Sequence, residues 1–208
     1  MFARWLPAEW RVYDLTAGQR PATLNECDAY ITTGSKASVY DDEPWIHNFA
    51  DLTREIQAAN KPYLGVCFGH QMMGHALGGR VAKSPNGWGI GVHTFAVQQQ
   101  EPWMQPAVPA VNLLMSCQDQ VLDLPPGAQV LAGNSHCPVG IFRVGRMLGI
   151  QGHPEFTPAY ADALLNLRRE RIGPERVDNA LATLALPLHA HLLARWAALF
   201  LHQEPARN

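Results

Sequence analysis

Short apolar runs alternate with segments of helical spacing through the first half of the chain. Apolar positions over Ile46–Asn60 fall on one face of a helix, and a second helix is predicted over Gly69–Leu77, closed by glycines that accept the left-handed conformation of a helix end. The strands predicted around these helices are Trp10–Leu15, Ala29–Thr33 and Pro62–Cys67. This strand–helix–strand order predicts an α/β fold with a mostly parallel sheet.

The pattern changes in the middle of the chain, where short apolar runs follow one another through turns that contain Gly or Pro. The additional strands predicted there are Val81–Lys83, Ile90–Val97, Val111–Ser116, Val130–Ala132, Val139–Val144 and Met147–Gln151. From Pro158 onward the pattern is helical, with breaks at Gly173–Pro174 and at Pro187. The middle therefore predicts a small antiparallel β region, and the last part a helical C-terminus.

Length and composition agree with one compact unit. The chain has 208 residues, of which 47% are apolar, and we expect one domain over 1–208 with a helical extension over 171–208. Charged residues make up 16% and the formal net charge is −2, so nothing predicts a nucleic-acid partner or an acidic membrane surface.

The sequence gives no sign of a membrane span or a targeting segment. The start, residues 1–7, lacks a basic region followed by an apolar run, and the apolar stretch Leu181–Ala194 is too short to span a bilayer and contains Pro187. We therefore expect a cytoplasmic location. Free thiols are then expected for the four cysteines, at positions 27, 67, 117 and 137.

The most informative segment is the passage from a strand into a helix around Cys67. Gly65-Val-Cys-Phe-Gly69 places a nucleophile between two glycines at this junction, the pattern of a nucleophile elbow. Such a turn lifts the sulfur out of the sheet and sets it at the N-terminus of the next helix, where unpaired N–H groups favour the thiolate. The alternative, a buried and inert cysteine, is the usual fate of an isolated free Cys, but the elbow favours a nucleophile.

A thiol nucleophile needs a base, and the base needs a residue that orients it. Gly149-Ile-Gln-Gly-His-Pro-Glu155 provides both after a predicted strand. His153 and Glu155 lie two residues apart, so in extended backbone their side chains share a face. A turn with a polar surface explains His-Pro-Glu about equally well by itself; together with the elbow, the motif predicts a Cys67–His153–Glu155 triad.

These two motifs, Gly-Val-Cys-Phe-Gly-His-Gln and Gly-His-Pro-Glu, resemble the signature segments of class I glutamine amidotransferases. The chain is similar to stand-alone proteins related to the amidotransferase half of GMP synthase and to γ-glutamyl peptidases. The resemblance implies a flavodoxin-like sheet and the triad Cys67, His153 and Glu155. It also implies that the γ-amide of glutamine, or of a γ-glutamyl compound, is cleaved through a thioester with release of ammonia or an amine.

The resemblance also implies residues for the oxyanion hole and the substrate. Backbone N–H groups near Gly34 or Ser35, with that of Phe68, would receive the negative charge of the tetrahedral intermediate. Gln71 matches the glutamine that holds the amino-acid end of the substrate. By itself, the loop reads as an ordinary turn and Gln71 as a surface residue of a helix.

Two further substrate contacts are implied by Ser116-Cys-Gln-Asp119. Related proteins often have Ser-His-x-Asp there and grip glutamine through backbone groups. Cys117, which replaces the histidine, and Gln118 are therefore candidate contacts, although Cys117 is equally explained as a core thiol.

No metal or organic cofactor is expected for this half-reaction. Cys67, His70 and His75 are close in sequence, but no second Cys or carboxylate cluster completes a tetrahedral site. The expected partners are glutamine or a γ-glutamyl small molecule and, if the protein supplies ammonia, a separate synthetase that accepts it.

The sequence departs from the family at its start. Relatives usually open with an apolar strand that lies centrally in the sheet, whereas residues 1–6 are amphipathic and no such strand precedes Val12. Either the chain begins late or the sheet is built without this strand, in which case we expect an exposed sheet edge.

Two other functional classes remain. A non-catalytic binding or regulatory module could keep the fold, but all three triad residues are present. An α/β-hydrolase esterase with a Cys nucleophile fits less well, because such enzymes place the acid before the histidine, whereas Glu155 follows His153.

Overall fold

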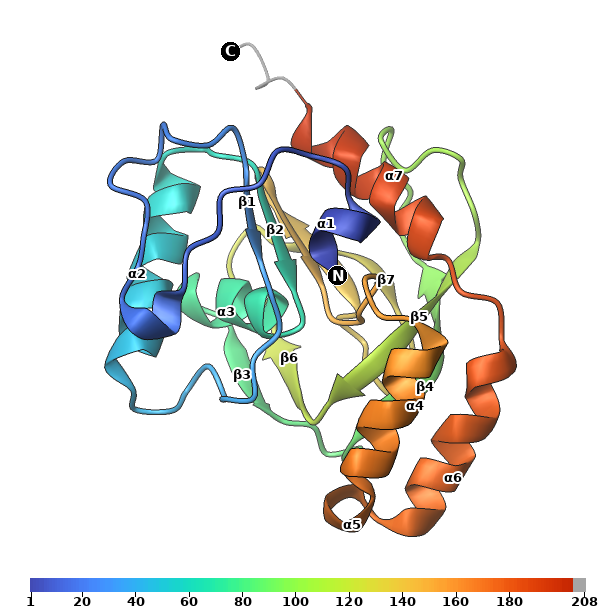
Figure 1. The fold of residues 1–208 in the computed structure, drawn as a ribbon. Coiled ribbons are helices and arrows are strands. Elements are labelled where there is room, and N and C mark those ends of the chain that lie inside the picture. The colour runs from blue at the N-terminus through green and yellow to red at the C-terminus, as the bar shows by residue number, and fades with distance from the viewer. Residues whose placement is uncertain (204–208) are drawn as a thin grey trace.

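The computed structural model describes residues 1–203, and Figure 1 shows their arrangement. The strands are β1 (Tyr30–Thr32), β2 (Tyr63–Val66), β3 (Arg80–Lys83), β4 (Gly89–Val97), β5 (Ala110–Cys117), β6 (Asp119–Asp123), β7 (Gln129–Gly133), β8 (Ile141–Val144) and β9 (Met147–Ile150). The α-helices are α1 (Phe2–Trp5), α2 (Pro44–Ala58), α3 (Phe68–Ala76), α4 (Pro158–Leu167), α5 (Arg169–Ile172), α6 (Pro174–Ala182) and α7 (Ala190–Leu201). Two short 3-10 helices are η1 (Leu15–Ala17) and η2 (Thr183–Ala185).

Seven strands form the main sheet in the order β1-β2-β9-β8-β7-β4-β5. The pairs β1–β2 and β2–β9 are parallel, and the other neighbours are antiparallel. Because two reversals restore the original direction, β1, β2, β9, β7 and β5 all point the same way, and only β8 and β4 are reversed. The predicted α/β class with a mostly parallel sheet is confirmed in this sense. The small antiparallel part is also present, as the separate pair β3–β6.

Helices cover both faces of the sheet, and side chains that alternate along the strands fill the two cores. On β2, Tyr63 points to the core under α2 and α3, while Leu64 and Val66 point to the opposite core. Trp196 and Phe200 of α7 pack into that opposite core. Figure 1 shows α2 and α3 on one side of the strands and α1 and α7 on the other. The parallel strands are therefore buried on both faces.

The helix α2 forms as its hydrophobic spacing predicts. Pro44 occupies its first turn, where a missing N–H costs nothing. Its buried face consists of Ile46, Phe49, Ala50, Leu52, Thr53 and Ile56. These residues recur every three or four positions, so one face of the helix packs on the sheet.

The C-terminal region breaks where Gly and Pro predict it. Gly173, with φ of 105°, separates α5 from α6, and Pro187 lies between η2 and α7. The predicted helical extension runs to residue 208, and its last five positions lie outside the described residues. Within residues 1–203 no single helix is long and apolar enough to cross a membrane; the bent pair Pro174–Ala185 and Ala190–Leu201 meets that test by length and composition only.

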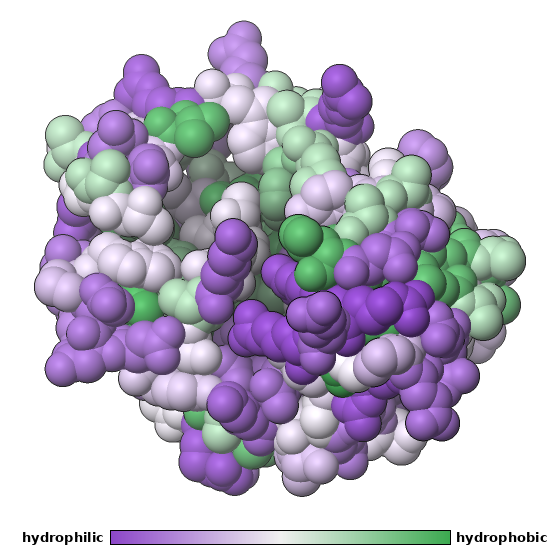
Figure 2. Space-filling model, turned by 60° about the horizontal axis from the view of Figure 1, so that its bottom comes forward, coloured by the Kyte–Doolittle hydropathy of each residue, from purple (hydrophilic) through white to green (hydrophobic). Residues whose placement is uncertain are grey.

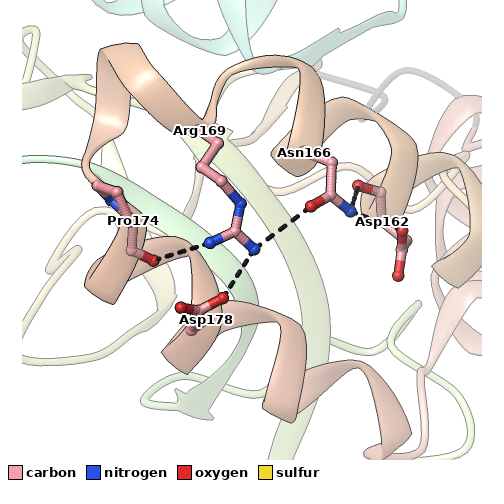
Figure 3. Close-up of polar contacts among 5 residues, drawn as sticks. All are labelled: Asp162, Asn166, Arg169, Pro174 and Asp178. Carbon is pink, nitrogen blue, oxygen red and sulfur yellow. Dashed lines mark hydrogen bonds and ion pairs between the residues drawn. The ribbon is translucent and has the colours of Figure 1, made fainter.

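A polar network joins α4, α5 and α6 (Figure 3). The Arg169 guanidinium pairs with Asp178 at 2.7 Å and donates to Asn166 Oδ1 at 3.4 Å and to the Pro174 carbonyl at 3.5 Å. Asn166 in turn donates to Asp162 Oδ1 at 2.9 Å. These groups lie near the surface, so their main effect is to fix the angle between the helices after the Gly173 turn.

The predicted strand Trp10–Leu15 is wrong. This segment is irregular and leads into η1, because its polar side chains bind locally: Arg11 and Tyr13 both contact Glu26, at 2.6 and 2.8 Å. The Val12 side chain is 82% exposed. The main sheet therefore ends at β1, whose pairing partner among the described residues is β2. Sequence analysis also missed β6, in which the apolar alternation is short.

Candidate active site

Cys67 lies at the point where β2 ends and α3 begins. Its backbone has φ of 54° and ψ of −101°, a conformation that a non-glycine residue rarely adopts and that costs about 1–3 kcal/mol. The Cys67 N–H donates to the Ile150 carbonyl at 2.9 Å, and the Cys67 carbonyl accepts from Gln71 N–H at 2.9 Å. One bond ties the turn to β9 and the other starts the helix. The strand-to-helix turn on which the predicted elbow depends is therefore present, and it is strained at Cys67.

Two glycines make the elbow possible. A Cβ atom on Gly65 would lie 2.5 Å from the backbone C and O of Gly69, and one on Gly69 would lie 2.0 Å from Thr32 Oγ1. No side chain fits at either position. Tyr63 Oη donates to the Gly69 carbonyl at 3.1 Å and lies 2.6 Å from Thr32 Oγ1, so hydrogen bonds connect β1, β2 and α3 where they meet.

His153 and Glu155 form a buried pair after β9. His153 Nδ1 lies 2.9 Å from Glu155 Oε1, and their side chains are 6% and 2% exposed. The backbone N–H of His153 donates to the backbone carbonyl of Leu114 in β5 at 2.7 Å. This bond ties the segment after β9 to β5, the last strand of the main sheet. With Nδ1 turned to the carboxylate, Nε2 is the ring atom left to exchange a proton.

The thiol and the imidazole lie together beside Gly34. A Cβ atom on Gly34 would lie 3.1 Å from His153 Cε1, 3.9 Å from His153 Nε2 and 3.7 Å from Cys67 Cβ. The predicted residues Cys67, His153 and Glu155, which come from two distant parts of the chain, are thus brought to one place. They lie at the carboxyl ends of β2 and β9, the edge where α/β proteins place their sites.

The surroundings of Cys67 favour a thiolate paired with an imidazolium. A hydrogen bond with the Cys117 thiol and the positive charge of His153 hold the pKa of Cys67 well below its usual value, although burial acts in the opposite direction. For His153, burial alone would lower the pKa, but the Cys67 thiolate and Glu155 raise it to about 10. The Cys117 pKa is raised well above its usual value by its hydrogen bond with Cys67 and by burial. Hence Cys67 ionises and Cys117 keeps its proton.

The backbone groups expected to hold the oxyanion border the thiol. Phe68 is the first residue of α3, and the first N–H groups of a helix have no intrahelical acceptor. Gly34 and Ser35 lie in the exposed loop after β1, with Gly34 beside Cys67. Ser35 Oγ accepts from Ala37 N–H at 3.2 Å, so its side chain shapes the loop.

The predicted substrate contacts lie around the same point. Gln71 is buried, and its amide donates to the Asp119 carbonyl at 2.7 Å and to Gln151 Oε1 at 3.3 Å. Both of these hydrogen bonds are donated by the side-chain nitrogen, Nε2. Cys117 ends β5, and Gln118 follows between β5 and β6.

Two features of the site were missed by the sequence analysis. The Asp119 carboxylate accepts hydrogen bonds from Ser38 Oγ at 2.5 Å and from Tyr40 Oη at 3.0 Å. These bonds attach the loop after β1 to the start of β6. Phe156 stacks on the His153 ring, with centroids 3.9 Å apart and an interplanar angle of 11°. In the sequence, the only sign of this stack is the aromatic residue directly after His-Pro-Glu. The contacts of Asp119 join segments about 80 residues apart, so no short sequence pattern predicts them.

The described residues contain no group of three or more His, Cys, Asp or Glu side chains arranged to hold a metal ion. His70 is fully buried, and burial lowers its pKa to about 3. Its neutral ring packs edge-on against Phe142, with centroids 4.9 Å apart. His70 is thus part of the core.

The carboxyl ends of β1 and β2 point to the lower side of Figure 1. Figure 2 turns this side toward the viewer and shows a hollow, with hydrophobic residues inside it and mostly hydrophilic residues around it.

Comparison with known families identifies the chain. The model of the class I glutamine amidotransferases matches residues 9–167, which include both motifs and the whole triad. The chain belongs to this family. The match confirms the resemblance that the two motifs predict.

Individual relatives agree with the family. The chain is 28% identical to γ-glutamyl peptidase 3 of Arabidopsis thaliana over 189 residues, which cover 85% of this chain and 75% of that protein. It is 35% identical to the GMP synthase of Pyrobaculum aerophilum over 134 residues, 64% of this chain but 25% of the synthase. The crystal structure of a glutamine amidotransferase from Methylobacillus flagellatus superposes with a TM-score of 0.78 at 21% identity, covering 96% of this chain and 87% of that one. This last likeness concerns the fold.

We predict that Gly65→Ala removes activity by displacing the sulfur. The new methyl group would press on the Gly69 backbone and should cost about 1–3 kcal/mol of unfolding free energy, measured by urea denaturation. The control is Gly18→Ala, at a φ of 74° with open space around it, which should cost about 1–2 kcal/mol through backbone strain and keep full alkylation of Cys67. Full Cys67 reactivity in folded Gly65→Ala would contradict the role given to this glycine.

We also predict that iodoacetamide alkylates Cys67 at a rate nearly independent of pH from about 6 to about 8, because the thiolate is already formed there. In His153→Ala the rate should rise with pH over this range, because one of the two groups that lower the Cys67 pKa is lost, and in the wild-type chain unfolded in guanidinium it should rise about tenfold per pH unit, as for an ordinary thiol. The rate is followed on the Cys67 peptide by mass spectrometry. A tenfold rise per unit in the native wild-type protein would contradict the ion pair.

Proposed function

We propose that this amidotransferase is a cysteine-dependent hydrolase that cleaves the γ-amide of glutamine or of a γ-glutamyl compound. The observation that carries the proposal is the buried Cys67–His153–Glu155 constellation, with His153 Nδ1 held 2.9 Å from Glu155 at the edge of the strained elbow. It supports acyl transfer because it combines an ionised nucleophile, a proton carrier and a residue that orients the carrier.

In the first half of the proposed reaction, the Cys67 thiolate attacks the γ-carbonyl carbon. The negative charge that forms on the carbonyl oxygen is received by the N–H groups of Phe68 and of the loop at Gly34 and Ser35. When the C–N bond breaks, the His153 imidazolium gives its proton to the leaving nitrogen, and ammonia or an amine departs. A γ-glutamyl thioester on Cys67 remains.

In the second half, neutral His153 takes a proton from water as the water oxygen attacks the thioester carbonyl. Collapse of this intermediate releases glutamate and restores the Cys67 thiolate next to the His153 imidazolium. The Glu155 carboxylate keeps Nδ1 protonated throughout and offsets the charge of the ring. Each proton taken up is returned, so this cycle consumes only water and the amide.

Substrate recognition in this proposal uses the groups around the elbow. The Gln71 carbonyl oxygen and the backbone at Cys117 and Gln118 would bind the amino-acid end of the γ-glutamyl group. The name of the plant relative, γ-glutamyl peptidase, supports a γ-glutamyl amide. The GMP synthase match, which spans a quarter of that protein, supports the second version, in which glutamine is the substrate and a separate synthetase accepts the ammonia.

An assay separates these two versions. Release of ammonia or amine is measured on glutamine, γ-glutamyl dipeptides and a glutathione-like tripeptide, each with and without cell extract. Turnover of the peptides by the protein alone supports the peptidase version. Turnover of glutamine that rises strongly with extract supports the synthetase version.

We predict that Cys67→Ala lowers turnover by at least about 10⁴-fold, because no other group can form the acyl intermediate. His153→Ala should cost about 10²–10⁴-fold through the lost proton transfer, and Glu155→Ala should cost less than His153→Ala, since solvent can partly replace an orienting group. Circular dichroism checks the fold of each variant. Cys27→Ala, a free cysteine outside the site, is the control and should keep wild-type turnover; wild-type rates in Cys67→Ala would refute the assignment.

The alternative, a non-catalytic binding module with the same fold, makes an opposite prediction. A γ-glutamyl electrophile such as 6-diazo-5-oxonorleucine should modify Cys67 in the hydrolase, in proportion to the loss of turnover. A native protein that binds glutamine but whose Cys67 stays unmodified would favour the module.

A further inference from the structure

Phe156 lies flat against the imidazole of His153. The ring centroids are 3.9 Å apart and the planes differ by 11°. A tight turn produces this contact, since the Phe156 N–H donates to the His153 carbonyl at 3.4 Å. The Phe156 ring also meets Tyr160 of α4 edge-on, with ring centroids 4.5 Å apart. Phe156 therefore contacts both the histidine and the helix.

The contact adds a constraint to the hydrogen bond between His153 and Glu155. The hydrogen bond from Nδ1 to Glu155 fixes one atom of the ring but leaves rotation about the line of that bond. A flat aromatic ring at van der Waals distance blocks this rotation, because tilting the imidazole would drive its edge into Phe156. Together the two contacts hold Nε2 in one direction, toward Cys67.

The stack also acts on the charge of the imidazole. The face of an aromatic ring is electron-rich and attracts a cation placed over it. The ionisable groups that face His153 are Cys67 on the elbow and Glu155 on its own segment, with Cys117 beyond Cys67 and Tyr160 next to Phe156. Phe156 adds a favourable interaction with the protonated ring that needs no further charge.

We propose that Phe156 is a positioning residue, which keeps the imidazole of His153 aligned for proton transfer and stabilises its cationic form through face-to-face stacking. This inference rests on the proposed function, since it assigns the residue to the proton transfers of that reaction. The residue touches neither the thiol nor the scissile bond in this scheme and acts through His153.

The test is the pH profile of Phe156→Leu, which keeps an apolar side chain and removes the aromatic face. We expect kcat to fall about tenfold with KM nearly unchanged, and the alkaline limb of kcat/KM to move down by about half a unit to one unit, because the imidazolium loses its proton more easily. Phe156→Tyr, which restores the aromatic face, should return both quantities to near the wild-type values. Phe2→Leu is the matched control: it makes the same substitution at a ring that contacts Trp5 and not His153, and it should leave the alkaline limb in place.

A second measurement keeps the shape of the side chain constant. Phenylalanine with an increasing number of ring fluorines, incorporated at position 156, weakens the electron-rich face at nearly unchanged volume. The alkaline limb should then fall progressively with the number of fluorines. Such a series applies even if Phe156→Leu folds poorly.

The outcomes are distinguishable from failure of the proposed function. If the wild-type protein turns over no γ-glutamyl substrate and Cys67 resists the diazo electrophile, the proposed function fails. If the wild-type protein is active but Phe156→Leu and the fluorinated series keep its pH profile and kcat, the inference about Phe156 is overturned. A Phe156→Leu variant with lower stability and an unchanged profile would show a purely structural residue, which also overturns it.

Discussion

The close approach of α3 to the carboxyl end of β2 is the constraint on which the rest of the site depends. Thr32 of β1 leaves no room for a Cβ atom on Gly69, and the Gly69 backbone comes so near to Gly65 that a Cβ atom has no room there either. This contact forces Cys67 into its left-handed conformation, and the cost of that conformation is offset by the burial of α3 and by the hydrogen bond from Cys67 N–H to β9. Without the contact, the sulfur would lie in the plane of the sheet.

Once the sulfur is raised, burial and charge decide its chemistry. A buried thiol would normally stay protonated, and an isolated buried imidazole would stay neutral. Each becomes charged here because the other is present, and Glu155 prevents the imidazolium from being an unpaired buried cation. The neighbouring Cys117 adds a hydrogen bond while retaining its own proton. The two thiols therefore take different states: Cys67 ionises, and Cys117 donates a hydrogen bond to it.

Sequence reasoning was reliable where a function depends on a local pattern. Gly65-Val-Cys-Phe-Gly69 predicted the elbow because strand, glycines and helix are adjacent in the chain, and the spacing of apolar residues predicted the buried face of α2. It failed where side-chain contacts hold a segment in a conformation that its spacing of apolar residues does not predict. The alternation of Trp10 and Val12 suggested a strand, but Glu26 binds Arg11 and Tyr13 and holds the segment in an irregular form outside the sheet.

Phe156 could not be predicted for a different reason. Its position next to Glu155 is visible in the sequence, but stacking on His153 depends on the turn that folds residue 156 back over residue 153. Phe156 also has to contact α4. Neither the turn nor the contact with α4 can be predicted from the order of residue types alone.

Asp119 connects the two halves of the site across the fold. Its carboxylate accepts from Ser38 and Tyr40 in the loop that carries Gly34, and its backbone carbonyl accepts from Gln71 on α3. The loop proposed to hold the oxyanion and the residue proposed to hold the amino-acid end of the substrate are thus attached to one residue at the start of β6. Asp119 therefore links these two parts of the site directly through its side chain and its backbone. Because Asp119 is the first residue of β6, the small β3–β6 sheet, which is separate from the main sheet, connects the loop after β1 with α3.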